Sequence, residues 1–167
     1  MRVSVVKVSD LDINTPLGQL TLAEEQAAKE IFERNMAGWR YIETDKTNKA
    51  TVDAILEKNG FVRGVVETKC RQMVLERFST TFGSKWLVTA AKIERCKHIA
   101  EDFNVPFYGF LYLVLSRKLL IKRLWQPNYG WLVKIRREET ATRATVNGGM
   151  AMRVNAFIDM SSAILVR

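Results

Sequence analysis

The sequence predicts a single α/β domain over residues 1–167, with a mixed central sheet flanked by helices. Three observations predict this fold class. Apolar side chains recur at helical spacing in residues 22–35, two apolar strands flank Asn59-Gly60, and residues 106–115 form an almost continuous apolar and aromatic run. The expected order is a helix, three strands, a second helix and a strand, followed by extra strands towards the C-terminus.

The first helix is expected at residues 22–35. Thr21 and Glu24 have the spacing of a capping box, in which each side chain accepts a hydrogen bond from a free backbone N–H at the helix start. Residues 39–43 are expected to form a short strand, and the polar residues 44–50 a loop. A hairpin should follow, because Asn59-Gly60 suits a two-residue turn with positive φ at both positions.

The strands of this hairpin are residues 52–58 and 61–70. Helical periodicity predicts a second long helix at residues 86–103, and the run at 106–115 predicts a central strand that is covered on both faces. The remaining expected elements are strands at 118–125 and 131–136 around a turn at 126–130, a turn at 147–149, an edge strand at 154–158 and a short element at 163–166.

Charge and composition favour a nucleic-acid-binding protein inside the cell. Lys and Arg total 26 against 18 Asp and Glu, a net charge of +8 that attracts polyanions, although many basic proteins bind none. The two cysteines are too few for a disulfide framework, which indicates a reducing, cytoplasmic setting. A secretory signal pattern is absent, and no apolar run reaches the roughly 20 residues that span a bilayer. We therefore expect a soluble protein with no membrane partner.

Asp53, Glu67 and Lys69 form the one catalytic pattern in the chain. Side chains alternate along a strand, so Glu67 and Lys69 share a face while the Thr68 side chain points away. Mg²⁺, or Mn²⁺ as a substitute, binds oxygen ligands. Asp53, Glu67 and the Thr68 carbonyl would serve as those ligands. Lys69 would orient the attacking water or neutralise charge on a phosphate.

Register decides whether the two carboxylates can meet. With a two-residue turn and a regular ladder, Asp53 lies opposite Val66, and its side chain faces away from that of Glu67. One extra residue in the hairpin, as a bulge or a longer loop, places Asp53 opposite Glu67. We predict that irregularity. An acidic-x-Lys tripeptide without such support is usually a solvated ion pair.

These residues resemble the motif of the PD-(D/E)xK superfamily, the restriction-endonuclease-like nucleases that include Holliday-junction resolvases, phage exonucleases and repair nucleases. The resemblance covers about residues 20–124 and matches Asp53, Glu67 and Lys69 to the family pattern, with Val52 in place of a proline before the aspartate. It implies a restriction-endonuclease-like fold, a divalent metal and DNA cleavage. It also implies an acidic residue on the first helix and a Lys or Gln on the later one.

The helical acid could be Glu24, Glu25 or Glu30. Glu24 falls at the centre of the apolar face, so we favour it as a metal ligand, with capping of the helix as an equal alternative. On the second helix Lys85, Thr89 and Lys92 would form a stripe, and Lys92 is the better match to the helical lysine. Basic residues expected to contact nucleic acid, against a solvated alternative, are Lys85, Lys92, Arg117, Lys118, Lys122 and Arg123.

The leading hypothesis is a Mg²⁺-dependent deoxyribonuclease that hydrolyses phosphodiester bonds, with junction-resolving endonuclease activity as one form of it. The rival hypothesis is a nucleic-acid-binding protein that has this fold but performs no chemistry. A homodimer would pair two sites for cutting two strands, although no interface stripe stands out. His98 is the sole histidine, which argues against His-based nucleophilic systems, and no organic cofactor is expected.

Overall fold

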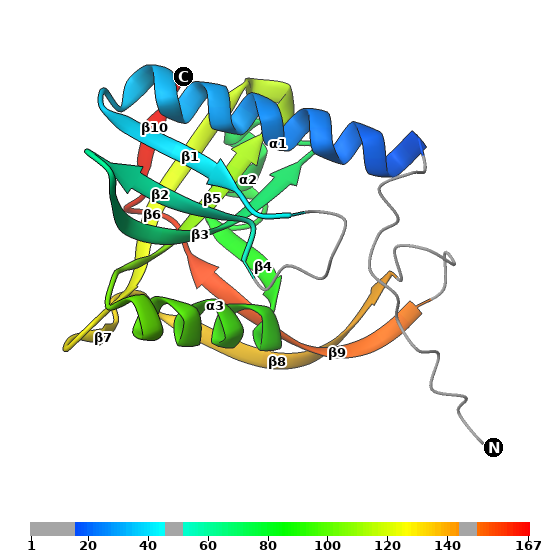
Figure 1. Cartoon of the computed structure of the whole chain (residues 1–167). Helices are drawn as coiled ribbons and strands as arrows, with labels where there is room; N and C mark the ends of the chain where they lie inside the picture. Colours follow the sequence, from blue (N-terminus) through cyan, green and yellow to red (C-terminus); the bar gives the residue numbers. More distant parts are fainter. Residues whose placement is uncertain (1–15, 46–51, 144–149) are drawn as a thin grey trace.

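The computed structural model describes residues 16–45, 52–143 and 150–167. Two sheets and the helices packed on them make up the described fold (Figure 1). In chain order the elements are α1 (Pro16–Asn35), β1 (Trp39–Glu43), β2 (Ala54–Lys58), β3 (Phe61–Arg71), α2 (Leu75–Thr80), β4 (Lys85–Thr89), α3 (Ala90–Phe103), β5 (Phe107–Leu113), the 3-10 turn η1 (Val114–Ser116), β6 (Lys118–Gln126), β7 (Gly130–Trp131), β8 (Ile135–Arg143), β9 (Met150–Asp159) and β10 (Ile164–Val166).

The main sheet has the order β1-β2-β3-β5-β6-β10, with β7 paired to β6. β3 and β5 run parallel, whereas the other neighbours are antiparallel, so the sheet is mixed. This arrangement confirms the predicted α/β class and places β5 inside the sheet, as its apolar sequence indicates. The smaller sheet has the order β4-β9-β8.

Alternation along the main strands produces two cores, one on each face of the sheet. On one face α1 contributes Ala28, Ile31 and Phe32, which pack with residues such as Val66. On the other face α3 and the small sheet cover residues such as Val65 (Figure 1). Neighbouring β3 residues therefore face different layers, which gives Glu67 and Thr68 different surroundings.

The predicted helix at residues 86–103 is wrong at its start. Residues 85–89 form β4 instead, which pairs with β9, and α3 begins only at Ala90. Trp86 and Val88 are buried while their neighbours are less so, a two-residue period that suits the aromatic and β-branched side chains here. Helix α2 was not predicted.

Within the described residues helix α1 extends over Pro16–Asn35, so it includes the six residues before the predicted start. Thr21 is consequently inside the helix and caps nothing, and its hydroxyl donates to the Leu17 carbonyl at 3.0 Å. The prediction of a capping box is therefore wrong.

The C-terminal region also differs from expectation. The segment predicted as an edge strand, 154–158, belongs to β9, which is the middle strand of the small sheet. The edge strand is β10, next to β6. The strand predicted at 131–136 is divided between the end of β7 and the start of β8. The turn predicted at 147–149 lies outside the described residues.

Gly109 on β5 leaves room for the Trp86 ring, which joins β4 to the main sheet. A Cβ atom at this position would overlap the ring and lie 2.9 Å from Leu124 Cδ1. We expect Gly109→Ala to lower the free energy of unfolding by about 1–3 kcal/mol, because the packed neighbours must move. Urea denaturation followed by circular dichroism measures the change.

A Trp86→Phe background is the matched control, since phenylalanine has a smaller ring. The Gly109→Ala penalty should be at least ~0.5 kcal/mol smaller in that background. An equal penalty in both backgrounds would show that the Trp86 ring does not restrict the position.

Candidate active site

The β2-β3 hairpin contains the predicted irregularity. Asn59 and Gly60 have φ values of 54° and 79°, as a tight turn of this kind requires. The register changes between Leu56 and Glu57, where Leu56 pairs with Gly64 but Glu57 pairs with Val62. Arg63 is the extra residue of a β-bulge. Continuing the ladder from Ala54 opposite Val66 places Asp53 opposite Glu67, so this prediction is confirmed.

Asp53 extends the hairpin pairing beyond the last residue of β2. Its N–H donates to the Val66 carbonyl at 3.0 Å, and its Oδ2 accepts the Thr68 N–H at 2.8 Å. These two bonds hold the aspartate across β3 on either side of Glu67. The carboxylate is buried, and its Oδ1 lies 3.8 Å from Lys92 Nζ.

Glu67 lies between two ammonium groups. Lys69 Nζ is 2.9 Å from its Oε1, and Lys92 Nζ is 3.4 Å from its Oε2. Cys96 Sγ, one turn beyond Lys92 on α3, lies 3.9 Å from Oε2. The carboxylate is completely buried, and Oε1 has the Lys69 ion pair but no hydrogen bond of regular geometry among the described residues.

Burial makes this cluster electrostatically unusual. It raises the pKa of Glu67 to about 7; the Asp53 charge acts in the same direction, while Lys69 and Lys92 oppose both. Burial lowers the pKa of Lys69, but the charges of Glu67 and Asp53 outweigh that effect and raise it above its usual value. Lys69 therefore remains charged while Glu67 is poised to titrate near neutral pH.

On the opposite face of β3, the Thr68 hydroxyl forms a 2.8 Å hydrogen bond with the Tyr41 hydroxyl. Burial raises the pKa of Tyr41, which keeps this phenol neutral. The neutral pair fixes the chain beneath Glu67 and leaves the charged groups on the α3 side. Tyr41 was not predicted as part of the site, and its place on a short strand gave no signal for it.

The candidate helical acids lie on the α1 side of the sheet. Glu24 accepts a hydrogen bond from Gln72, just beyond β3, and Glu30 accepts one from Gln26 at 3.0 Å. The Glu25 charge helps to raise the pKa of Tyr41, as does that of Asp53. Glu24 is thus held by Gln72 and does not gather with Asp53 and Glu67 among the described residues.

The predicted metal shell of Glu24, Asp53 and Glu67 is thus not assembled. Within residues 16–45, 52–143 and 150–167, no three His, Cys, Asp or Glu side chains gather closely enough to hold a metal ion. Asp53 and Glu67 remain as a pair of oxygen donors, and the backbone of Thr68 runs between them.

The other predicted basic residues do not form the expected stripe. Lys85 is on β4 and pairs with Asp159 at 3.5 Å, and Thr89 precedes α3 without capping it through its side chain. Only Lys92 of that set reaches the carboxylates. Cys96, which was not predicted as part of the site, lies one turn after Lys92, and this spacing was already contained in the predicted helix.

The second predicted basic group surrounds β6, which β5 separates from β3. Lys122 donates to Ser162, and Arg123 donates to Gln126 at 2.9 Å and to Tyr108 at 3.0 Å. Arg117 has a left-handed backbone, with φ of 50°, immediately before Lys118 at the start of β6. These side chains are therefore outside the carboxylate cluster.

The geometry agrees with a comparison against protein families. The family described as "Phage putative PDDEXK endonuclease" matches residues 21–121. The chain belongs to this family. The matched segment includes Asp53, Glu67, Lys69 and Lys92, and the predicted resemblance is confirmed. This PDDEXK protein therefore comes from a family described as endonucleases.

Among solved structures, one similar chain is Hjc, a Holliday junction resolvase from the archaeal hyperthermophile Archaeoglobus fulgidus. It has 17% sequence identity and a TM-score of 0.44, over 62% of this chain and 74% of that one. No curated protein matches this PDDEXK protein. Its described helices include none that is long and apolar enough to cross a membrane.

The raised pKa of Glu67 predicts a pH-dependent loss of stability in metal-free buffer. Folding favours the protonated form, so this contribution is complete below the ordinary pKa and is lost as pH rises to about 7. The free energy of unfolding of wild type, minus that of Glu67→Gln, should therefore fall by about 1–3 kcal/mol between pH 5 and pH 8.

Urea titrations in EDTA at four pH values measure this difference. Glu57→Gln on β2 is the control, because Glu57 lies on the same hairpin away from the cluster. If the free energy of unfolding of wild type minus that of Glu67→Gln stays constant or rises with pH, the pKa of Glu67 is not raised by folding.

Proposed function

We propose that this protein is a metal-dependent deoxyribonuclease, acting as one domain over residues 1–167, and that Asp53, Glu67 and Lys69 carry phosphodiester hydrolysis. One observation carries the proposal. The Arg63 bulge brings the buried Asp53 and Glu67 carboxylates to within 3.8 Å and 3.4 Å of the same ammonium, Lys92 Nζ. Burying two such groups together is costly for a protein that uses them only for structure.

The donor set fits a hard divalent cation. Asp53 and Glu67 supply carboxylate oxygens, of which Glu67 Oε1 is buried without a hydrogen bond in the described part of the chain, and the Thr68 carbonyl would be a third oxygen ligand. These residues would hold Mg²⁺, with Mn²⁺ as a substitute. When bound, such an ion supplies positive charge at the phosphate and lowers the pKa of water.

The two lysines would divide the remaining work. The Lys69 side chain is 33% exposed, so its ammonium can reach a substrate while it remains beside Glu67. It would orient the attacking water or neutralise charge that develops on the phosphate. Lys92 is 23% exposed and contacts both carboxylates, so it would hold them in position and then turn towards a phosphate.

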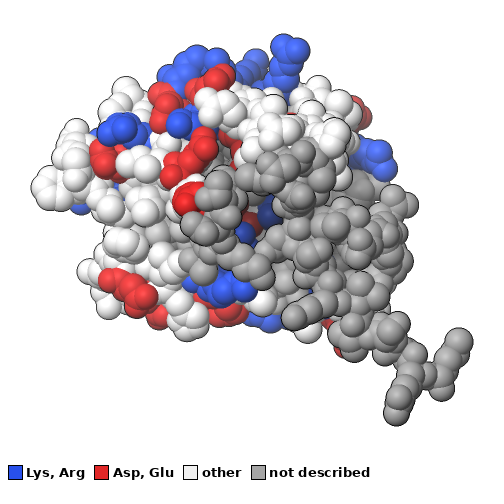
Figure 2. Space-filling view, turned by 45° about the vertical axis from the view of Figure 1, so that its right-hand side comes forward, with Lys and Arg blue, Asp and Glu red and all other residues white. Residues whose placement is uncertain are grey.

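DNA is the proposed substrate because the chain has a net charge of +8 and the family consists of endonucleases. Figure 2 shows acidic and basic side chains interspersed on the described part of one face, with both signs in a hollow near its middle. The net charge therefore attracts DNA in general, whereas the position of the DNA on the protein depends on individual basic side chains. Lys85, Arg117, Lys118, Lys122 and Arg123 are proposed phosphate contacts, and a homodimer would be needed to cut both strands of a junction.

One observation favours the non-catalytic alternative as a second candidate. Lys69 and Lys92 already balance the charges of Asp53 and Glu67, so the cluster needs no metal for neutrality. In that case the protein would bind DNA without cutting it. Metal binding and cleavage separate the two candidates.

Cleavage should depend on the charged groups of the cluster. We expect Glu67→Gln and Lys69→Met to reduce Mg²⁺-dependent cleavage of plasmid and single-stranded DNA at least ~100-fold, since each removes a charge that acts on the transition state. Initial rates on gels measure the effect. Glu57→Gln and Lys97→Met are matched controls that should retain wild-type rates. Equal rates in all five proteins would refute the assignment.

Metal binding should stabilise the wild-type protein. Mg²⁺ or Mn²⁺ at 100 times its dissociation constant would add about 2.7 kcal/mol to the free energy of unfolding. Differential scanning fluorimetry should show this as a higher Tm for wild type and for Asp102→Asn, and as no change for Asp53→Asn. If neither ion changes the Tm of the wild-type protein while DNA binding persists, the non-catalytic candidate is correct.

A further inference from the structure

A pocket of about 420 Å³ lies between β3 and the small sheet, beyond the carboxylate cluster along β3. Glu67, Lys69 and Arg71 are alternate residues of β3 and share one face, and Arg71 lines the pocket. Alternate strand residues are about 6.6 Å apart, so Arg71 is about 13 Å from Glu67 along β3, a span of roughly two nucleotides of an extended strand. The pocket is therefore placed to receive a part of the substrate near the bond being cut.

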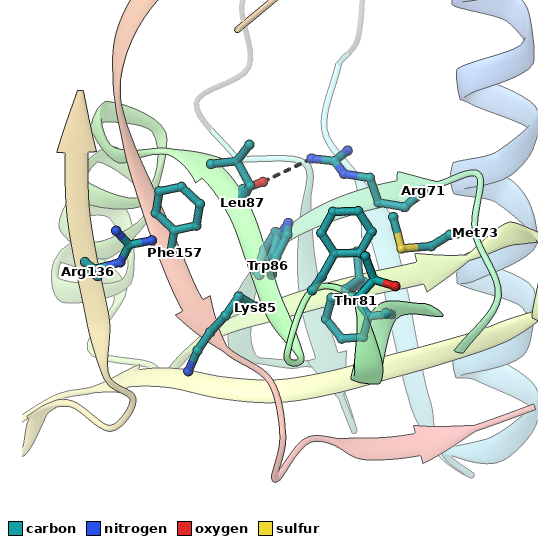
Figure 3. A pocket seen from close by; sticks show the side chains of 11 residues that line it. Arg71, Met73, Thr81, Lys85, Trp86, Leu87, Arg136 and Phe157 are labelled. Carbon is teal, nitrogen blue, oxygen red and sulfur yellow. Dashed lines mark hydrogen bonds between the residues drawn. The ribbon is translucent and has the colours of Figure 1, made fainter. Parts of the chain in front are cut away.

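The walls of the pocket suit a flat, apolar ring. Aromatic surface comes from Phe78 on α2, Trp86 on β4, Phe157 on β9 and Phe82 before β4. The other apolar lining residues are Met73, Leu87 and Leu111, and Figure 3 labels Met73, Trp86, Leu87 and Phe157. Its volume is within the range of pockets that bind small organic groups. Aromatic stacking is the usual way in which proteins hold unpaired bases, because every base has a π face.

The rim of the pocket suits an anion. Arg71, Lys85 and Arg136 line it, and no carboxylate is among the lining residues, although Lys85 pairs with Asp159 and Arg136 with Glu138 from outside the pocket. Arg71 donates to the carbonyls of Cys70 at 3.1 Å and Leu87 at 3.0 Å, the latter drawn as a dashed line in Figure 3. It has no ion pair with a carboxylate among the described residues. Its positive charge is thus rigidly held and available to a phosphate.

Trp86 adds a polar observation. The residue is 1% exposed, and its indole N–H has no acceptor among the described residues. In Figure 3 the indole nitrogen is on the side of the ring nearer Arg71. A buried donor without an acceptor is costly. The carbonyl oxygens and ring nitrogens at the edges of nucleobases are acceptors that would satisfy it.

We infer that this pocket binds one unpaired nucleobase of the DNA strand, about two nucleotides from the scissile phosphate. The inference rests on the proposed function, and it specifies the substrate class as DNA with an unstacked nucleotide near the cleavage site. The base stacks on the aromatic wall while Arg71 and Arg136 bind the flanking phosphates. A fully paired duplex offers no such base unless one is extruded.

The test compares the binding of intact and abasic DNA by wild type and variants. EDTA is present so that no metal-dependent cleavage occurs. Fluorescein-labelled single-stranded DNA carrying one abasic position, moved along the strand, is titrated with protein and followed by anisotropy. We expect one or two positions at which the missing base weakens wild-type binding about tenfold. Phe157→Ala should weaken binding to intact DNA by a similar factor and show no further loss at those positions.

Phe61→Ala, at the exposed hairpin tip, is the matched control and should keep the full abasic penalty. If Phe157→Ala does not fold, Arg136→Gln is the second test variant, and Arg137→Gln, at the neighbouring position, is its control. Binding by Arg136→Gln should weaken more than that by Arg137→Gln. Absence of any abasic penalty in wild type, or a full penalty in both Phe157→Ala and Arg136→Gln, overturns the pocket assignment.

The same experiment separates this inference from the proposed function. Cleavage is measured independently with Mg²⁺ on intact single-stranded DNA. Binding that depends on the base together with no cleavage would overturn the nuclease proposal and retain the pocket. Cleavage together with binding that no abasic position weakens would retain the nuclease proposal and overturn the pocket assignment.

Discussion

The bulge at Arg63 determines which face of the sheet Asp53 can use. Side chains alternate with a period of two, so a shift of one residue would move Asp53 to the α1 side and leave Glu67 alone among the lysines. The turn at Asn59-Gly60 is tight, which means that the extra residue must be accommodated within the strands. Once the register is set, the Thr68 N–H and the Val66 carbonyl bind Asp53 and fix it across β3.

The same register creates an energetic conflict. Two carboxylates that share a buried site repel each other, and burial penalises each charge separately. Lys69 and Lys92 offset part of this cost, yet the pKa of Glu67 remains about 7. Natural proteins tolerate such destabilising groups chiefly where the groups have a function. This reasoning supports a role for the cluster beyond structure, and it applies even though α1 supplies no third carboxylate to it.

The sequence predicted the elements whose signals are local. The type of turn at Asn59-Gly60 and the apolar run of β5 have physical causes within a few residues, and both were predicted correctly. The need for a bulge followed from counting residues between Asp53 and Glu67. By contrast, residues 85–89 have a pattern that suits either a helix or a strand, and pairing with β9, some 70 residues later, decides between them. The small sheet could not be predicted without that long-range pairing.

That long-range pairing also shapes the candidate site. Because β4 ends at Thr89, α3 begins one residue later and its first turn carries Lys92 to Asp53 and Glu67. Arg71 bonds the Leu87 carbonyl of the same strand, so β4 is tied to β3 beside the cluster. The Trp86 ring, seated over Gly109, holds β4 against the main sheet. The lysine that contacts both carboxylates and the aromatic pocket farther along β3 therefore depend on one short strand, and a disturbance of its packing should affect both.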